Sequence, residues 1–169
     1  DGLLQDNQQL SQNKRVFGAV PGLTFEKSDN NPVLEPAETW EQDQIGEASV
    51  VWGHDGELKM LYRAGAYEIG LATSNDGVSW TKDPDNPVLS TNSNGDNLGY
   101  PSAALYDGTY YMWVADTGAG DIWQFTSTDA QNWTEQGKIL TTSNSGWDSD
   151  KLYNTCPIIL GGTWYLYYE

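Results

Sequence analysis

The stretch "GLATSNDGVSWTKDPDNPVL" (70–89) has the plan of a strand, a tight Asn-Asp-Gly turn, a second strand centred on Trp80 and an exit led by proline. The stretch "FTSTDAQNWTEQGKIL" (125–140) repeats this plan about 53 residues later. Short alternating runs bounded by Asp, Asn and Gly are typical of β-strands joined by tight turns. The two stretches therefore predict a β-structured unit that occurs more than once.

A longer comparison extends the repeat to almost the whole chain. Residues 49–80 align with residues 102–133, with Trp80 on Trp133, and a third copy begins at 157–169. Each full copy holds four strand-like runs joined by three turns. A repeat of this length with four antiparallel strands is typical of a β-propeller blade, which buries its two faces against neighbouring blades.

We therefore predict an all-β fold, a five-bladed β-propeller of four-stranded antiparallel blades that is incomplete in this chain. Residues 1–16 are polar and patternless and are expected to form an N-terminal arm or linker, with the partial propeller at 17–169. The parts of the propeller are an outer strand, two blades and a half-blade, expected at 23–34, about 47–82, about 100–135 and 156–169. The chain is then a fragment, a part of a longer protein, or a half that pairs with another chain. The alternative is that the two and a half sheets pack as a sandwich.

The composition excludes several classes of function. The 169 residues carry 24 acidic and 8 basic side chains, a net charge of −16, so nucleic acid is a poor partner. No apolar run is long enough to insert into a membrane. The single cysteine, Cys156, allows no intrachain disulfide, and zinc is excluded because Cys and His do not cluster. We expect no cofactor and no metal; the loop acids leave calcium open, without a motif to support it.

The repeated pattern resembles the five-bladed β-propellers related to glycoside hydrolase families 43, 32 and 130. The resemblance covers about residues 20–169. Its residues here are the following: Asn31-Pro32-Val33-Leu34, Trp40, Asp55-Gly56, Met60, Tyr62, Ile69-Gly70-Leu71-Ala72-Thr73-Ser74, Asp76-Gly77, Trp80 and Lys82. These are turn and packing residues, so the resemblance implies the architecture more strongly than an activity.

The resemblance also implies where a site would lie. In these propellers three carboxylates, from the innermost strands of three successive blades, point into one funnel at the axis. They stand just before the proline-type position of the inner strand, which here holds Glu47, Tyr100 and Cys156. Hydrolysis of a glycosidic bond needs one carboxyl group as acid and another as base or nucleophile. Glu47 is the candidate catalytic residue, and the other two positions depart from the hydrolase pattern.

Five further residues are candidates for binding a sugar. Tyr100 and Trp147 could stack on a sugar ring, Asp116 and Asp148 could accept hydrogen bonds at the rim, and Arg63 could hold a carboxylate or a hydroxyl group. Each also has a purely structural interpretation. The aromatic rings could wedge between blades, the loop acids could be merely solvated, and Arg63 could form a structural ion pair.

Two functions follow, and a third stays open. The first is a glycoside hydrolase-like enzyme, secreted or extracellular, acting on an oligo- or polysaccharide. The second is a non-catalytic propeller that binds a glycan. The third is a structural module that self-associates, or pairs with another chain, through the open blade edge at 163–169. The sequence does not distinguish an enzyme from a binding module, and it gives neither the sugar nor the linkage.

Overall fold

The computed structural model describes residues 27–169 of the chain, which divides into the units Asp1–Asn31 and Pro32–Glu169. In the first unit the described residues form a turn, in which the Asn31 N–H donates to the Ser28 carbonyl oxygen at 3.2 Å. The predicted outer strand at 23–34 is not formed in its described part, because residues 27–34 adopt turns, bends and irregular backbone. The rest of that strand and the predicted arm lie outside the described residues.

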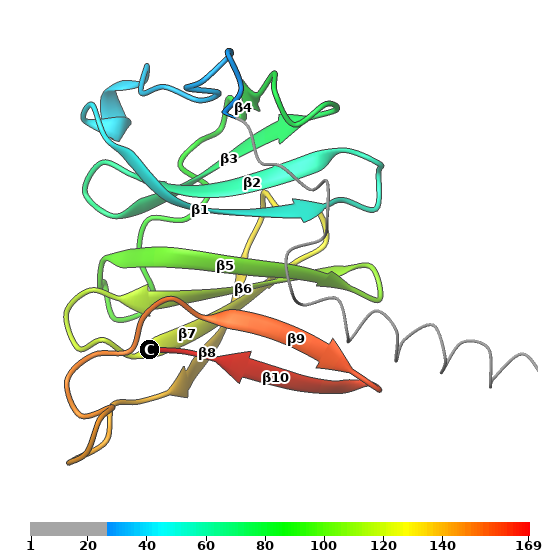
Figure 1. Ribbon diagram of the computed structural model, residues 1–169. Coiled ribbons are helices and arrows are strands. Elements are labelled where there is room, and N and C mark those ends of the chain that lie inside the picture. Colours follow the sequence, from blue (N-terminus) through cyan, green and yellow to red (C-terminus); the bar gives the residue numbers. More distant parts are fainter. Residues whose placement is uncertain (1–26) are drawn as a thin grey trace, which may run out of the picture. The chain divides into compact units, whose positions relative to one another are not determined.

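The second unit contains two four-stranded antiparallel sheets and one two-stranded sheet (Figure 1). Blade 1 consists, in order, of β1 (Ile45–Trp52), β2 (Leu58–Ala64), β3 (Glu68–Ser74) and β4 (Thr81–Lys82). Blade 2 consists of β5 (Leu98–Tyr106), β6 (Thr109–Asp116), β7 (Ile122–Ser127) and β8 (Thr134–Leu140). The half-blade consists of β9 (Cys156–Leu160) and β10 (Thr163–Tyr167). A single 3-10 turn, η1 (Thr39–Glu41), is the helical element of the described part.

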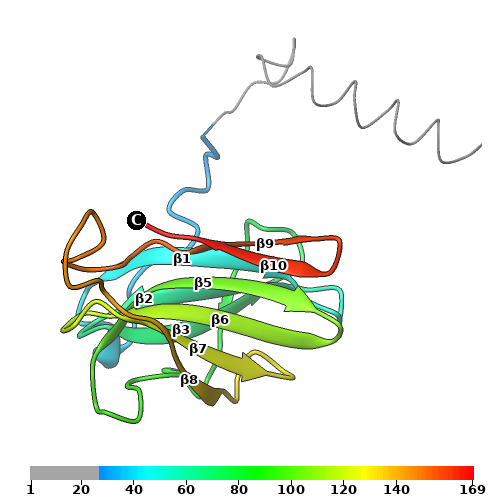
Figure 2. The same ribbon diagram turned by 90° about the horizontal axis from the view of Figure 1, so that it is seen from below.

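The three first strands, β1, β5 and β9, lie beside one another and run in the same direction (Figures 1 and 2). A hydrogen bond of 3.0 Å from the Ala103 N–H to Ser49 Oγ links β5 directly to β1. Each blade then meanders outward from this inner strand, so blade 1 ends on β4 and blade 2 on β8. This is the arrangement of propeller blades, and the alternative of a sandwich is wrong.

The turns that follow β3 and β7, which are the repeated turns of the sequence, have the same geometry in both blades. Gly77 in blade 1 and Ala130 in blade 2 are left-handed, with φ of 74° and 64°. Their carbonyl oxygens accept hydrogen bonds from the indole Nε1 of Trp80 and Trp133, at 3.1 and 3.0 Å. The repeat of sequence is thus a repeat of one turn, which fixes where the outer strand of each blade begins.

The blade boundaries differ from the prediction mainly at the outer strands. Blade 2, expected at about 100–135, extends further, because β8 pairs with β7 up to Leu140. In blade 1 the outer strand β4 has only two residues, and a separate bridge between Leu89 and Ile69 continues the pairing. The Pro-containing sequence after Lys82 explains the short strand, because proline cannot donate a ladder hydrogen bond.

Apolar side chains fill the spaces between the sheets. The cluster between blades 1 and 2 consists of Val51, Leu61, Ile69, Leu71, Leu98, Tyr110, Met112, Val114, Trp123, Phe125 and Ala130. A second cluster, Trp113, Ala115, Ile122 and Leu152, is packed by side chains of the half-blade, among them Trp164 and Leu166. Blade 2 is therefore covered on both faces, which fixes the start of β5 between the starts of β1 and β9.

A buried carboxylate braces blade 1 from within. Glu41 is fully buried and accepts hydrogen bonds from the N–H groups of Ala37 and Glu38, the Tyr62 hydroxyl and Lys82 Nζ, at 2.7, 2.9, 3.0 and 2.6 Å. Burial by itself raises the pKa of Glu41, but these hydrogen bonds outweigh it and lower the pKa below its ordinary value. The charged Glu41 thus ties η1 to β2 and β4.

Candidate functional site

A polar pocket of about 360 Å³ lies where the inner strands of the three sheets begin. Its lining residues are Glu47, Ala48 and Ser49 from β1, Tyr100, Pro101 and Ser102 from β5, and Asn154 and Thr155 just before β9. The fold thus brings together two of the three predicted axial positions, Glu47 and Tyr100. The third blade contributes Asn154 and Thr155 in place of Cys156.

Glu47 forms an ion pair with Arg63 inside blade 1. Arg63 Nε donates to Glu47 Oε2, and the side chains are 16% exposed for Arg63 and 34% for Glu47. Strand pairing sets Arg63 opposite Gly46. A β-carbon on Gly46 would lie only 3.1 Å from a terminal nitrogen of Arg63, so glycine leaves room for the guanidinium. Glu47 therefore enters the pocket with one carboxylate oxygen held by Arg63.

Tyr100 reaches the pocket through an irregularity in β5. The pairing of β5 with β6 shifts between Gly99 and Ser102, and Tyr100 has a left-handed backbone with φ of 55°. Its ring packs against Tyr153 at 4.6 Å between centroids. Partial burial, and next the negative charge of Glu47, raise the pKa of Tyr100 above its ordinary value. Tyr100 therefore stays protonated and can both donate and accept a hydrogen bond.

The third blade departs from the sequence prediction by two residues. Asn154 shares the left-handed backbone of Tyr100, with φ of 46°, whereas Cys156 begins the regular strand β9 and is exposed. Just before β9, Tyr153 and Glu169 exchange two backbone hydrogen bonds, at 2.9 and 3.2 Å, while Cys156 pairs with Tyr167. Three residues of this strand thus lie opposite two of its partner, as they do between Gly99 and Ser102 in β5. Thr155 is buried, and its Oγ1 has no hydrogen-bond partner among the described residues. A proline-based alignment misses Asn154 and Thr155 because Pro101 lies within this bulge, whereas Pro157 lies beyond it, in the regular strand β9.

Asp116 lies in the interior of a turn and not in the lining of the pocket. It is 1% exposed, and its Oδ1 accepts hydrogen bonds from the N–H groups of Ala119 and Gly120 at 2.6 and 3.1 Å. Its Oδ2 accepts one from the Trp123 indole at 3.2 Å. These contacts make Asp116 the carboxylate that shapes the β6–β7 turn.

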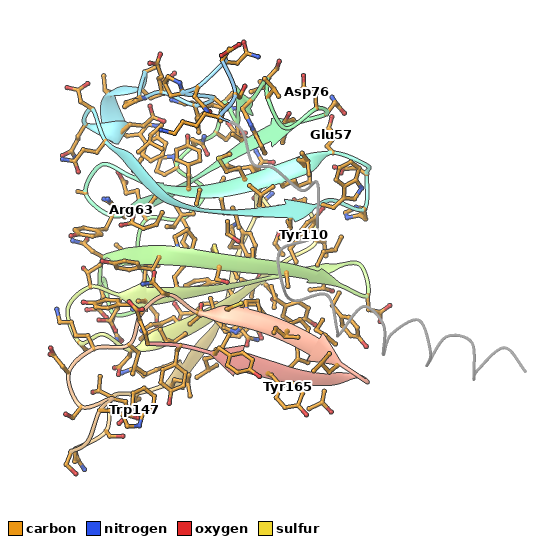
Figure 3. The ribbon with its side chains drawn as sticks, viewed as in Figure 1. Glu57, Arg63, Asp76, Tyr110, Trp147 and Tyr165 are labelled. Atoms are coloured by element: carbon orange, nitrogen blue, oxygen red, sulfur yellow. The ribbon has the colours of Figure 1, made fainter. Side chains whose placement is uncertain are left out.

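Trp147 and Asp148 lie in the connector between β8 and β9, also outside the lining of the pocket. Trp147, labelled in Figure 3, is 76% exposed and stacks on Tyr168 at 5.4 Å between centroids. Trp40 packs against Tyr62 in blade 1 at 6.0 Å, and the repeat places Tyr62 and Tyr168 at corresponding positions. This correspondence favours the structural interpretation of Trp147, as a residue that braces its blade.

The described residues contain no group of three or more His, Cys, Asp or Glu side chains arranged to hold a metal ion. Among the same residues, no helix is long and apolar enough to cross a membrane.

The chemistry of the pocket follows from its lining. Glycoside hydrolysis requires two carboxyl groups, about 5–5.5 Å apart for retention or about 6.5–9.5 Å apart for inversion. Within residues 27–169 the pocket lining holds one carboxylate, Glu47, and that group is paired with Arg63. The remaining polar side chains of the lining are the hydroxyls of Ser49, Tyr100, Ser102 and Thr155 and the amide of Asn154. This set can form several hydrogen bonds with a polyhydroxylated ligand.

Comparison with protein families gives one match. Residues 63–160 match the family model described as "Glycosyl hydrolases family 32 N-terminal domain". This range includes Arg63, β5 and β9, and it ends in the half-blade. No curated protein matches the sequence significantly.

Several solved structures share the fold. A glycosyl hydrolase from Bacteroides ovatus superposes with a TM-score of 0.66 and 20% identity, over 86% of this sequence and 53% of its own. A family 117 glycoside hydrolase of the marine bacterium Zobellia galactanivorans gives 0.61 and 18%, over 79% and 51%. A mutant family 32 beta-fructofuranosidase of Bombyx mori in complex with sucrose gives 0.52 and 21%, over 68% and 27%. The protein described here spans about half the length of the first two.

Proposed function

Because the chain belongs to the family of glycosyl hydrolase family 32 N-terminal domains, we propose that its pocket at the starts of β1, β5 and β9 binds a carbohydrate without hydrolysing it. Glu47, Tyr100 and Asn154 are the residues that would contact the sugar. We further propose that the ligand is an extracellular oligo- or polysaccharide and that the protein is secreted, since its acidic composition suits such a setting.

The observation that carries this proposal is the pairing of Glu47 with Arg63 in a pocket that has no other carboxylate among its described lining residues. Glycoside hydrolysis needs a second carboxyl group near the first. Glu47 Oε2 accepts from Arg63, which fixes the carboxylate, while its other oxygen can accept a hydrogen bond from a ligand. Charge-assisted hydrogen bonds of this kind bind hydroxyl groups strongly and in a defined orientation.

The aromatic side of the pocket supports the same ligand class. The ring of Tyr100 lines the pocket beside the polar groups and packs on the ring of Tyr153, with 4.6 Å between the ring centroids. Sugars present both C–H faces and hydroxyl edges, so an aromatic ring next to several hydrogen-bonding groups fits them. Asn154 Nδ2 donates to Glu169 at 2.6 Å, which holds the amide and leaves its oxygen free to accept.

A second candidate function is a glycosidase in which Glu47 is one of several catalytic carboxylates. Its support is that the sequence spans about half the length of similar solved glycoside hydrolases, 53% of the Bacteroides ovatus protein and 51% of the Zobellia galactanivorans protein. Further carboxylates would then come from residues outside this sequence. Under this alternative Arg63 would orient Glu47 toward the scissile bond.

The test is a titration of the purified protein with sucrose by calorimetry, together with affinity electrophoresis in gels that contain levan, inulin, arabinan, xylan or pectin. For a carbohydrate that binds, Glu47→Gln is expected to weaken binding roughly tenfold or more, because hydrogen bonds to charged groups contribute about 1.5–3 kcal/mol. The matched control is Glu57→Gln, at the opposite end of blade 1 from Arg63 (Figure 3).

Release of reducing sugar, measured on the same panel, separates the two candidates. Binding without release, weakened by Glu47→Gln and kept by Glu57→Gln, supports a binding module. Release that disappears in Glu47→Gln, in a variant with an unchanged circular dichroism spectrum, favours the glycosidase. Equal retardation of both variants in every gel would refute a role for Glu47.

A further inference from the structure

Tyr67 lies behind the Glu47–Arg63 pair, in the hairpin between β2 and β3. It has a left-handed backbone with φ of 68°, and it is 38% exposed. Its ring lies under the guanidinium of Arg63, with Cζ of Arg63 5.0 Å from the ring centroid. One guanidinium thus contacts two groups, because its Nε donates to Glu47 while its face rests on Tyr67.

Blade 2 fixes this arrangement from the other side. The Leu98 N–H donates to the Tyr67 carbonyl oxygen at 3.3 Å, which ties the hairpin to the start of β5. A β-carbon on Gly99 would lie 3.3 Å from Cδ1 of Tyr67 and 3.6 Å from Cδ of Arg63. Both side chains therefore lie directly against the backbone of Gly99, and neither can swing toward blade 2.

We propose that Tyr67 is a positioning residue, whose ring holds the Arg63 guanidinium so that it orients the Glu47 carboxylate into the pocket. An arginine on an aromatic face loses little hydrogen-bonding capacity, because its N–H groups lie in its plane while the ring contacts its face. Without the ring, Arg63 would keep Glu47 as its one partner among residues 27–169, and it would have a larger choice of side-chain conformations. The role in ligand binding rests on the carbohydrate-binding function proposed above.

The first experiment needs no ligand. The sequence contains two arginines, Arg15 and Arg63, so the Nε–Hε region of a ¹⁵N NMR spectrum is simple, and Arg63→Lys assigns the Arg63 signal. We expect this signal to be protected from exchange with water and shifted by the Tyr67 ring current. Tyr67→Phe is expected to keep the protection, whereas Tyr67→Leu, which fills space without a π face, is expected to lose it.

The second experiment uses the carbohydrate that binds best among sucrose and the five polysaccharides. Tyr67→Leu is expected to weaken binding about two- to fivefold, the range of a partly exposed cation–π contact, and Tyr67→Phe is expected to retain the affinity. Equal protection of Arg63 in the wild type and in a folded Tyr67→Leu variant would overturn the proposal. Loss of protection in Tyr67→Leu without any carbohydrate bound by the wild type would instead refute the binding function and leave the positioning contact standing.

Discussion

Asp76 and Asp129 occupy the same place in two successive blades, and they use it in the same way. Asp76 Oδ1 accepts hydrogen bonds from the N–H groups of Val78 and Ser79 at 2.8 and 2.7 Å. Asp129 Oδ1 accepts from the corresponding N–H groups, two and three residues further along the chain, at 2.9 and 2.8 Å. Part of the acidity of this protein thus serves to cap turns rather than to bind a ligand.

Asp76 gives a prediction that depends on pH. The hydrogen bonds from the N–H groups of Ser79 and Val78, and then from the Ser74 hydroxyl, lower its pKa to about 2, against about 3.9 in an unfolded chain. A depressed pKa stabilises the folded state fully above pH about 4, and this contribution disappears as the pH falls through about 2. We expect Asp76→Asn to lower the urea midpoint at pH 6, and this difference to shrink progressively as the pH falls toward 2.

The matched control for this prediction is Asp150→Asn, an exposed acid in the connector before β9. It is expected to shift the urea midpoint little at either pH. A constant difference between wild type and Asp76→Asn from pH 6 down to pH 2 would show that the charge of Asp76 contributes nothing to stability.

At the residue scale, the sequence predicted best those side chains whose partners are close in sequence. The turn formers Asp76 and Asp129 bond to residues two and three positions away, so their role follows from the local pattern. Asp116 was expected at the rim of the pocket, and the structure buries it against the indole of Trp123. That contact depends on how β6 pairs with β7, which no local pattern encodes.

At the scale of elements, strands β2 and β3 fit together through one aromatic residue and one glycine. Tyr62 in β2 pairs with Gly70 in β3, and a β-carbon on Gly70 would lie 2.4 Å from Cζ of Tyr62. The ring cannot move aside easily, because Tyr62 is fully buried and its hydroxyl donates a hydrogen bond to Glu41 at 3.0 Å. The glycine is thus required by packing and not by its backbone conformation.

We therefore expect Gly70→Ala to reduce the free energy of unfolding by about 2 kcal/mol, as insertion of a methyl group into a packed interior does. Gly118→Ala is the matched control, since the nearest atom to its added β-carbon would be Asp116 Oδ1 at 3.7 Å. It is expected to change stability by less than about 0.5 kcal/mol. Urea unfolding at pH 7 measures both variants, and equal stabilities would mean that Tyr62 relaxes without cost.

The elements also explain why the third axial position was misplaced. The sequence alignment used the prolines Pro101 and Pro157, which made Tyr100 and Cys156 equivalent. All three inner strands carry an extra residue at their start, but Pro101 lies within this bulge, whereas Pro157 lies beyond it in β9. A bulge is set by the pairing of two strands, so the position of a proline in one strand does not show where the bulge lies.

At the scale of the whole molecule, the repeat predicted the blades because each unit carries its own turns and its own apolar pattern. What it did not predict is the interior arrangement between units, such as the burial of Leu152 beneath the half-blade. The half-blade differs from the two full blades in having no strand with a continuous buried run. Its outward side chains, Ile158, Leu160, Tyr165 and Tyr167, are all exposed.

This difference predicts unequal stability across the 169-residue chain. The β6 strand has five consecutive buried residues, Met112–Asp116, and both its edges are paired, whereas β10 pairs only with β9 among the described strands. Local opening costs least free energy where few apolar contacts and a single strand pairing hold a segment.

We expect the backbone amides of β9 and β10 to exchange hydrogen roughly tenfold faster than those of β6, or more. A tenfold ratio corresponds to a difference of about 1.4 kcal/mol in the free energy of local opening. Hydrogen exchange followed by mass spectrometry measures this ratio. Equal protection would mean that another chain covers the open edge of β10, and light scattering on the same sample would then show a dimer if that chain is a second copy.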